Sequence, residues 1–303
     1  MLPPRLREGD TVAVVAPAGP VRAERLRPGL ELLAERFDVR CDDGVYSATG
    51  FLAGDDDRRA AELNAAFRDK DVRAIVLARG GYGITRILDR LDAAALRSDP
   101  KPIVGFSDAT ALLSWAHRHA GVRGIHGPVV EQLGRLPASD VQWFVHMITT
   151  TAPAGIIPAD LQAIGASPGK PLEGVLLGGN LCLLSHLAGT SSMTHGGQVL
   201  LIEDIGERPY AIDRYLTHLR NAGVLEGVQA VVCGDFTNCA ETTNTQDPDV
   251  WAVIDERLRA FDLVGVRGLP VGHGERNLAL PYASRCSLDA SAGTIELLEP
   301  AVG

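Results

Sequence analysis

Residues 101–118, KPIVGFSDATALLSWAHR, place a short apolar run of β character directly before a run with helical periodicity. The same alternation recurs through the first half of the chain. Strand-like runs occupy residues 11–17, 74–78 and 102–106, and helical runs occupy residues 22–37, 55–70, 81–96 and 108–119. Such alternation indicates βαβ units and a parallel sheet that is buried on both faces. We therefore predict an open α/β domain over residues 1–150.

The composition changes at residues 149–174, which are rich in Pro, Gly, Ala and Thr and carry little charge. This chemistry is typical of a linker, which we place at residues 151–173. Beyond it, residues 285–300 form two β-like halves around a turn at Ala292 and Gly293, a pattern that predicts a hairpin. We expect residues 174–303 to form a second, smaller α/β domain with a more antiparallel sheet.

The composition excludes several classes of partner. The chain has 303 residues, of which 46% are hydrophobic and 22% are charged, with a formal net charge of −9. Nucleic acids and anionic membranes require clustered Lys and Arg, which this acidic chain lacks, so we expect a small-molecule or peptide partner. No segment approaches the roughly 18 apolar residues of a membrane span, and the first apolar run is too short for a signal peptide. We expect a cytoplasmic protein.

The cysteines predict neither disulfides nor a metal site. The chain has five of them, an odd number without a CxxC pair, so reduced thiols are expected. No HExxH or comparable ligand spacing occurs either. We therefore predict no metal and no cofactor.

Three segments follow predicted strands, where open α/β sheets bind their ligands: APAGP (16–20), ARGGYG (78–83) and GFSDA (105–109). ARGGYG matches neither the GxGxxG nor the Walker pattern. Its glycines have two compatible interpretations. They allow a tight turn with positive φ, and they allow backbone N–H groups to face a ligand, as an oxyanion hole requires.

GFSDA resembles the nucleophile elbow G-x-S-x-G, with Ala109 at the place of the last glycine. In that interpretation Ser107 is exposed on a sharp turn, and the amide of Asp108 lies at a positive helix end where an oxyanion would form. The competing interpretation is structural. Serine is among the best helix N-caps, and Asp108 would suit the first turn of a helix.

A nucleophilic serine needs a base, and two histidines are flanked by glycine at predicted strand ends. These are His126 in GIHGP and His273 in VGHGERN. His126 follows Ser107 by one helix, whereas His273 would come from the second domain and close a cleft between domains, a preferred place for sites. The other histidines lie in helical patterns or, for His195, in a loop: His117, His119, His146, His186 and His218 are the helical ones.

The imidazole of such a base is oriented by a carboxylate. Glu203, Asp204 and Glu207 follow an apolar strand in LLIEDIGERPY. Acidic residues at this place could equally cap the next helix. The local sequence leaves the choice between Glu203 and Glu207 open.

Taken together, six motifs make the sequence resemble the LD-carboxypeptidases, or muramoyl-tetrapeptide carboxypeptidases, a family that includes the microcin C self-immunity peptidases. The resemblance runs nearly from end to end. The motifs are, in order, VAPAGP, ARGGYG, GFSDAT, LLGGNL, IEDIGERPYAIDR and GHGERNLALP. It implies a Rossmann-like N-terminal domain, a linker, a smaller β-containing C-terminal domain and a metal-free site between the domains.

The resemblance also implies a Ser-Glu-His triad of Ser107, Glu203 and His273. The implied oxyanion hole uses the amide of Asp108 and one from Gly80 or Gly81. The implied activity is the release of terminal D-alanine from cytoplasmic murein tetrapeptides, after meso-diaminopimelate or L-lysine. Family members are often homodimers.

A carboxypeptidase must bind the free terminal carboxylate, for which Arg79 and Arg276 are candidates. Surface salt bridges are the alternative role of both arginines. One motif departs from the family, because LPYAS carries Ala283 where relatives often have glycine. That departure concerns a local turn.

Two other functions compete with this one. The first is a peptidase or amidase of the microcin-immunity type, which cleaves a peptidyl-nucleotide with the same triad. Immunity-type relatives have a longer insertion between the serine and the glutamate, so this compact chain favours cell-wall recycling. The second is a ligand-binding protein without catalysis, in which Ser107 is a cap and His273 is structural.

Overall fold

The computed structural model describes residues 1–167, 169–194, 197–240 and 248–303, which fold into two compact units. Unit 1 comprises Met1–Thr151, Leu278–Tyr282 and Pro300–Gly303, and unit 2 comprises Ala152–Asn277 and Ala283–Glu299. The chain therefore returns to unit 1 twice after the predicted linker. Each unit is described by itself.

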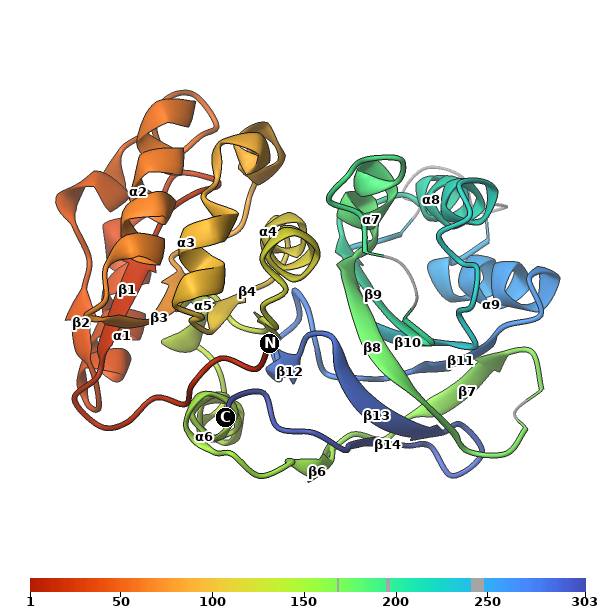
Figure 1. Cartoon of the computed structure of the whole chain (residues 1–303). Helices are drawn as coiled ribbons and strands as arrows, with labels where there is room; N and C mark the ends of the chain where they lie inside the picture. Colours follow the sequence, from red (N-terminus) through yellow and green to blue (C-terminus); the bar gives the residue numbers. More distant parts are fainter. Residues whose placement is uncertain (168, 195–196, 241–247) are drawn as a thin grey trace. The chain divides into compact units, whose positions relative to one another are not determined.

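Unit 1 is built on a six-stranded sheet in the order β12-β5-β4-β3-β1-β2 (Figure 1). Its strands are β1 (Thr11–Val15), β2 (Asp38–Arg40), β3 (Val72–Leu77), β4 (Ile103–Gly105), β5 (Ile125–His126) and β12 (Leu280–Pro281). The strands from β2 to β5 pair in parallel, and β12 pairs antiparallel with β5. The predicted open parallel sheet is confirmed.

Helices connect these strands. They are α1 (Ala23–Ala34), α2 (Asp56–Arg68), α3 (Ala93–Ser98), α4 (Ala109–Trp115), α5 (Val130–Leu133) and α6 (Ala138–Thr149). Short 3₁₀ helices occur at η1 (Asp43–Tyr46), η2 (Ile84–Arg86) and η3 (Leu88–Arg90), and α4 continues into a π-helical segment, η4 (Ala116–Ala120). The helix predicted over residues 81–96 is wrong. Gly83 has a φ of 128°, which no helix accommodates, and Asp92 caps α3 by accepting from the Ala95 amide.

Unit 2 is built on an eight-stranded mixed sheet in the order β6-β14-β13-β8-β9-β10-β11-β7. Its strands are β6 (Gly155–Ile156), β7 (Gln162–Gly165), β8 (Leu172–Asn180), β9 (Val199–Ile205), β10 (Ala230–Thr237), β11 (Val264–Arg267), β13 (Ser284–Asp289) and β14 (Thr294–Leu297). The four central strands, β8 to β11, are parallel, and antiparallel strands flank them on both sides. The predicted hairpin is β13–β14.

Three helices lie on one face of this second sheet, α7 (Leu181–Leu187), α8 (Pro209–Asn221) and α9 (Val250–Ala260) (Figure 1). α8 packs between α7 and α9. Its buried residues, such as Ile212, Leu216 and Leu219, recur at helical spacing. The α/β class predicted for both halves of the chain is confirmed.

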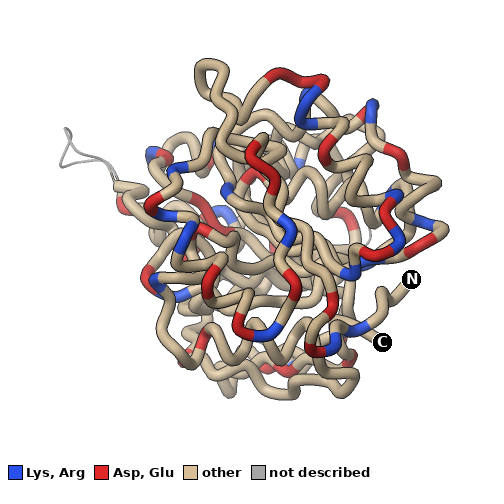
Figure 2. The backbone as a smooth tube through the Cα atoms, turned by 90° about the vertical axis from the view of Figure 1, so that its left-hand side faces the viewer, with Lys and Arg blue, Asp and Glu red and all other residues tan. Residues whose placement is uncertain are grey.

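The backbone trace agrees with the charge pattern of the sequence. In Figure 2, the positions of Lys and Arg are interspersed with those of Asp and Glu along the chain. Within the described residues, no helix is long and apolar enough to cross a membrane. All five cysteines are free thiols, and burial raises the pKa of Cys41, Cys182 and Cys239 to about 11.

Ala283 adopts a φ of 59° in the turn of the LPYAS motif. A Cβ atom in the left-handed region costs about 1–2 kcal/mol. We therefore expect Ala283→Gly to raise the free energy of unfolding by about 1 kcal/mol, measured by urea denaturation. Ala290→Gly is the control, since the φ of Ala290 is not positive, and it should lower stability instead. Equal effects of the two substitutions would contradict the strain argument.

Candidate active site

Ser107 occupies a strained turn between β4 and α4. Its φ is 63°, in the left-handed region that non-glycine residues rarely adopt, and strain of this kind is typical of functional turns. α4 begins at Ala109, and the residue at its N-cap position is Asp108, whose side chain makes no capping bond. The interpretation of Ser107 as a helix cap is therefore wrong.

The strand and helix around this serine approach closely. A Cβ atom placed on Gly105 would lie 2.8 Å from the Cβ of Ala109, so the sharp turn depends on a glycine at one position and a small side chain at the other. Ala109 thus fills the place of the last glycine of the elbow pattern. The half-buried Ser107 projects from this turn at the carboxyl end of β4.

The glycine turn after β3 lies directly against Ser107. A Cβ atom on Gly80 would lie 2.9 Å from the Ser107 Cβ and 3.0 Å from its Oγ. Gly81 has a φ of 119°, and a Cβ there would lie 3.0 Å from the backbone of Gly19, whose amide donates to the Gly80 carbonyl over 3.1 Å. The loops after β1, β3 and β4 therefore meet at one edge of the sheet.

The side chain of Asp108 has a role that the sequence did not reveal. It is buried, and its Oδ2 accepts from the amide of Ile84 over 2.8 Å. Burial raises the pKa of Asp108 to about 6, against the opposing effects of the Ile84 amide and the charge of Arg59. The carboxyl group of Asp108, the residue after Ser107, is thereby hydrogen-bonded to Ile84, the residue after the glycine turn Gly80–Gly83.

Unit 2 brings together a glutamate and a histidine. Glu203, fully buried in β9, accepts from Nδ1 of His273 over 2.7 Å. Because the carboxylate oxygen is an acceptor, Nδ1 carries the proton, and Nε2 is the basic nitrogen of the neutral ring. Gly272 permits this contact, since a Cβ there would lie 2.8 Å from Glu203 Oε2.

Two further side chains hold the histidine loop. Asn277 accepts from the Gly272 amide over 3.0 Å, and the carboxylate of Asp235 accepts from the Gly274 amide. Burial raises the pKa of Asp235, the Gly274 amide lowers it, and the nearby charge of Glu203 raises it again. Asn277 belongs to the GHGERN motif, so the sequence could have indicated its role. Asp235 lies 38 positions before His273, and no sequence pattern connects it with the histidine.

The three carboxylates at the end of β9 and just beyond it have different environments: Glu203 and Asp204 lie in the strand, and Glu207 follows it. Asp204 is buried and accepts from the Asn180 side chain and from the amide of Cys182, and burial raises its pKa to about 6. Glu207 hydrogen-bonds to Tyr215 and Cys182. Of the three carboxylates, Glu203 is the one that contacts His273.

The remaining candidates have these positions. Arg79 donates to the Pro20 carbonyl and lies 3.7 Å from Glu131, so its guanidinium already links the loop after β1 to α5 within unit 1. Arg276 is half-buried, and it follows His273 by three residues in the sequence. His126 is buried in β5, with its ring edge-on to Phe106. The five histidines predicted in helices lie in η4, α6, α7 and α8, and His195 lies outside the described residues.

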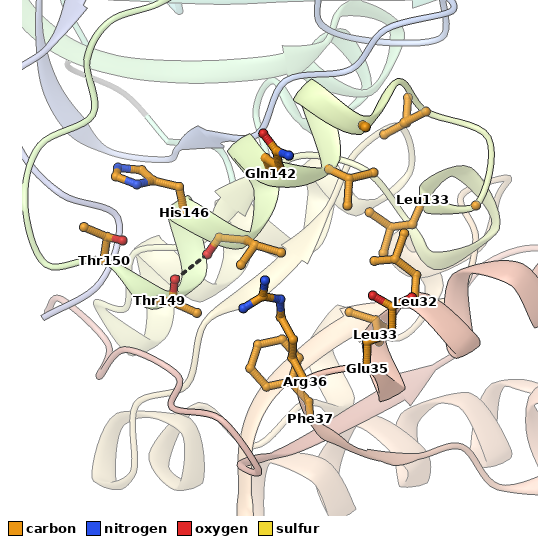
Figure 3. Close-up of a pocket in the computed structure, with 15 residues that line it drawn as sticks. Leu32, Leu33, Glu35, Arg36, Phe37, Leu133, Gln142, His146, Thr149 and Thr150 are labelled. Atoms are coloured by element: carbon orange, nitrogen blue, oxygen red, sulfur yellow. Dashed lines mark hydrogen bonds between the residues drawn. The ribbon is translucent and has the colours of Figure 1, made fainter.

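A cavity of about 620 Å³ lies elsewhere in unit 1, between the C-terminal end of α1 and α6 (Figure 3). Its walls include Leu33 and Phe37, with Arg36 and His146 among its polar groups. None of its lining residues belongs to the serine turn, the glycine turn or the Glu203–His273 pair. This cavity is therefore separate from the candidate active site.

Both halves of the chain match a single family of proteins. Residues 12–127 match the LD-carboxypeptidase N-terminal domain, and residues 173–288 match the LD-carboxypeptidase C-terminal domain. The first match contains the glycine and serine turns, and the second contains Glu203 and His273.

Individual proteins resemble the chain over nearly its full length. The murein tetrapeptide carboxypeptidase of Pseudomonas aeruginosa is 32% identical, with 92% of this chain and 93% of that protein covered. The crystal structure of muramoyltetrapeptide carboxypeptidase from Oxalobacter formigenes is 30% identical, with a TM-score of 0.79 and coverage of 95% and 97%. The microcin C7 self immunity protein has a TM-score of 0.86, with coverage of 100% and 99%, but at 22% identity it shows a shared fold alone.

Proposed function

The chain belongs to the LD-carboxypeptidase family, and we propose that it is a serine carboxypeptidase that releases terminal D-alanine from murein tetrapeptides. The bond cleaved is the L,D bond after meso-diaminopimelate or L-lysine. The observation that carries the proposal is the 2.7 Å contact between Glu203 and His273, an oriented imidazole of the kind that serine hydrolysis needs. The strained turn of Ser107 and the names of the murein-peptide relatives support it.

In the proposed mechanism, Ser107 Oγ attacks the carbonyl carbon of the third residue while His273 Nε2 takes the hydroxyl proton. Glu203 stabilises the imidazolium through Nδ1. The oxyanion accepts hydrogen bonds from the amide of Asp108 and from that of Gly80 or Gly81. The C–N bond then breaks as His273 protonates the departing amine of D-alanine.

The acyl-enzyme ester is hydrolysed by a water molecule that His273 deprotonates, which restores Ser107 and yields the tripeptide. We assign recognition of the terminal carboxylate to Arg276 or Arg79, since a guanidinium binds a carboxylate in bidentate fashion. A cytoplasmic location and a homodimer, both implied by the resemblance, complete the proposal.

The test is incubation of the purified protein with L-Ala-γ-D-Glu-meso-diaminopimelate-D-Ala, followed by mass spectrometry. We expect tripeptide and D-alanine in equal amounts. Two control peptides, one ending in L-alanine and one ending in D-alanine amide, should be cleaved far more slowly, because they lack the stereochemistry or the free carboxylate. Cleavage of a peptidyl-adenylate without cleavage of the tetrapeptide would assign the immunity-type activity instead, and cleavage of neither would indicate a binding protein.

A further inference from the structure

Unit 1 contains a fully buried arginine, Arg59, on the inner side of α2. A buried charge is costly unless it is paired and hydrogen-bonded. Nη1 of Arg59 donates to the carbonyl of Pro17 over 2.5 Å and to that of Gly83 over 2.8 Å, and Nη2 pairs with Asp56. The guanidinium is therefore used mainly to bind two backbone carbonyls.

These carbonyls belong to the loops after β1 and β3, which also contact each other through the Gly19 amide and the Gly80 carbonyl. The fit beside Gly83 is close, because a Cβ there would lie 2.7 Å from Arg59 Nη1. Arg59 thus binds the glycine turn at Gly83, its last residue, while the Gly19 amide binds it at Gly80, its first residue.

Asp108 connects the same structure to the nucleophile. Its carboxylate accepts from the amide of Ile84, the residue immediately after Gly83. Arg59 and Asp108 therefore hold consecutive residues, one from α2 and the other from the serine turn. Gly80 lies three residues before Gly83 and is packed against Ser107.

We propose that Arg59 is a positioning residue for catalysis, which holds the Gly80–Gly83 turn against Ser107 so that its amides face the developing oxyanion. This inference rests on the proposed function. An oxyanion hole requires donors within about 2.7–3.1 Å of the oxygen, and a misplacement of about 1 Å can lower the rate about 100-fold. Arg59 touches no reacting atom and acts through the backbone that it binds.

The neighbouring Arg58 provides a matched control for a purely structural role. It lies on the same helix, is half-buried, and binds the carbonyls of Ala16 and Ala53 as well as Glu62. None of its hydrogen bonds reaches residues 79–84. Arg58→Lys should therefore lower stability without displacing the glycine turn.

The experiment compares wild type, Arg59→Lys and Arg58→Lys. A fluorophosphonate phosphonylates the serine Oγ with loss of fluoride, and its phosphoryl oxygen occupies the oxyanion position. The labelling rate at Ser107, measured by mass spectrometry, thus reports the oxyanion hole without the murein substrate. The kcat and KM for D-alanine release are measured in parallel, and thermal unfolding of each variant is recorded.

We expect Arg59→Lys to lower both the labelling rate and kcat about 10- to 100-fold, because lysine keeps the charge but cannot reach both carbonyls, with KM changed less than 3-fold. Arg58→Lys should label within 3-fold of wild type. Equal labelling of the two variants, or a wild type that is not labelled at Ser107, would overturn the positioning role. A labelled wild type that releases no D-alanine would instead refute the proposed substrate and leave the comparison of the arginines valid.

Asp56→Asn is a milder variant in case Arg59→Lys does not fold. It keeps Arg59 and its two carbonyl bonds but replaces the carboxylate that orients Nη2 with a neutral amide. We expect a 3- to 10-fold slower labelling of Ser107. Arg86→Met is its control, since Arg86 binds the same carboxylate from the exposed side and should leave the labelling rate unchanged. Equal labelling of Asp56→Asn and Arg86→Met would contradict the proposal.

Discussion

Replacing Ser107 with alanine is expected to lower kcat for D-alanine release by a factor on the order of 10⁶, the loss measured when a comparable serine nucleophile is removed. The reason is that in the proposed mechanism Oγ forms the bond to the substrate carbonyl, and no other group replaces it. The measurement is steady-state release of D-alanine from murein tetrapeptide. KM should change little, because the methyl group leaves the surrounding turn in place.

Ser107→Gly is the matched control for the backbone strain at this position. It removes the hydroxyl and also relieves the left-handed φ of 63°. We expect it to be as inactive as Ser107→Ala but more stable than that variant by about 1 kcal/mol in the free energy of unfolding. A kcat close to that of wild type in either variant would exclude Ser107 as the nucleophile. Equal stability of the two would show that the turn is not strained.

The second large effect is expected for Glu203→Gln, which should lower kcat about 10⁴-fold. The glutamine amide is neutral and can donate to Nδ1 of His273, which would place the ring proton on Nε2. The imidazole would then present a donor where the reaction needs a base. Because the two side chains have nearly the same shape, KM and the unfolding transition should change little.

Glu207→Gln is the control for that substitution. Glu207 lies just after β9, the strand that contains Glu203, and hydrogen-bonds to Tyr215 and Cys182 instead of a histidine. We expect its kcat to stay within 3-fold of wild type. If Glu207→Gln were the more damaging of the two, the carboxylate would have been assigned to the wrong residue. Circular dichroism of both variants would exclude unfolding as the cause.

The parallel sheet of unit 1 could be predicted from sequence because its strands are short apolar runs and its helices show clear periodicity. The helix expected over residues 81–96 failed for a local reason. Its apolar spacing is helical, but Gly83 is needed at positive φ beside Arg59, and this tertiary contact overrides the periodicity. The return of residues 278–282 to unit 1 could not be foreseen, since β12 has only two residues.

Some residues of the candidate site could likewise be predicted from the sequence, and others could not. Ser107 and His273 could be named as candidates because glycines and strand ends mark them in the sequence, although the same signals mark His126. The choice of Glu203 over Glu207 required the resemblance to the family, and the contact with His273 now favours it. Arg59 could not be found, because nothing in RRAAEL distinguishes a buried arginine from an exposed one.

The composition of unit 1 from three separate stretches of chain has a consequence for synthesis on the ribosome. Domains generally fold from the N-terminus as they emerge. Here β5 has no partner on its outer edge until β12 is made, and the Gly303 amide bonds to the Pro3 carbonyl. The sheet that carries Ser107 is thus begun first and completed last. Until residues 278–282 are translated, its open edge must be kept from pairing with other nascent chains.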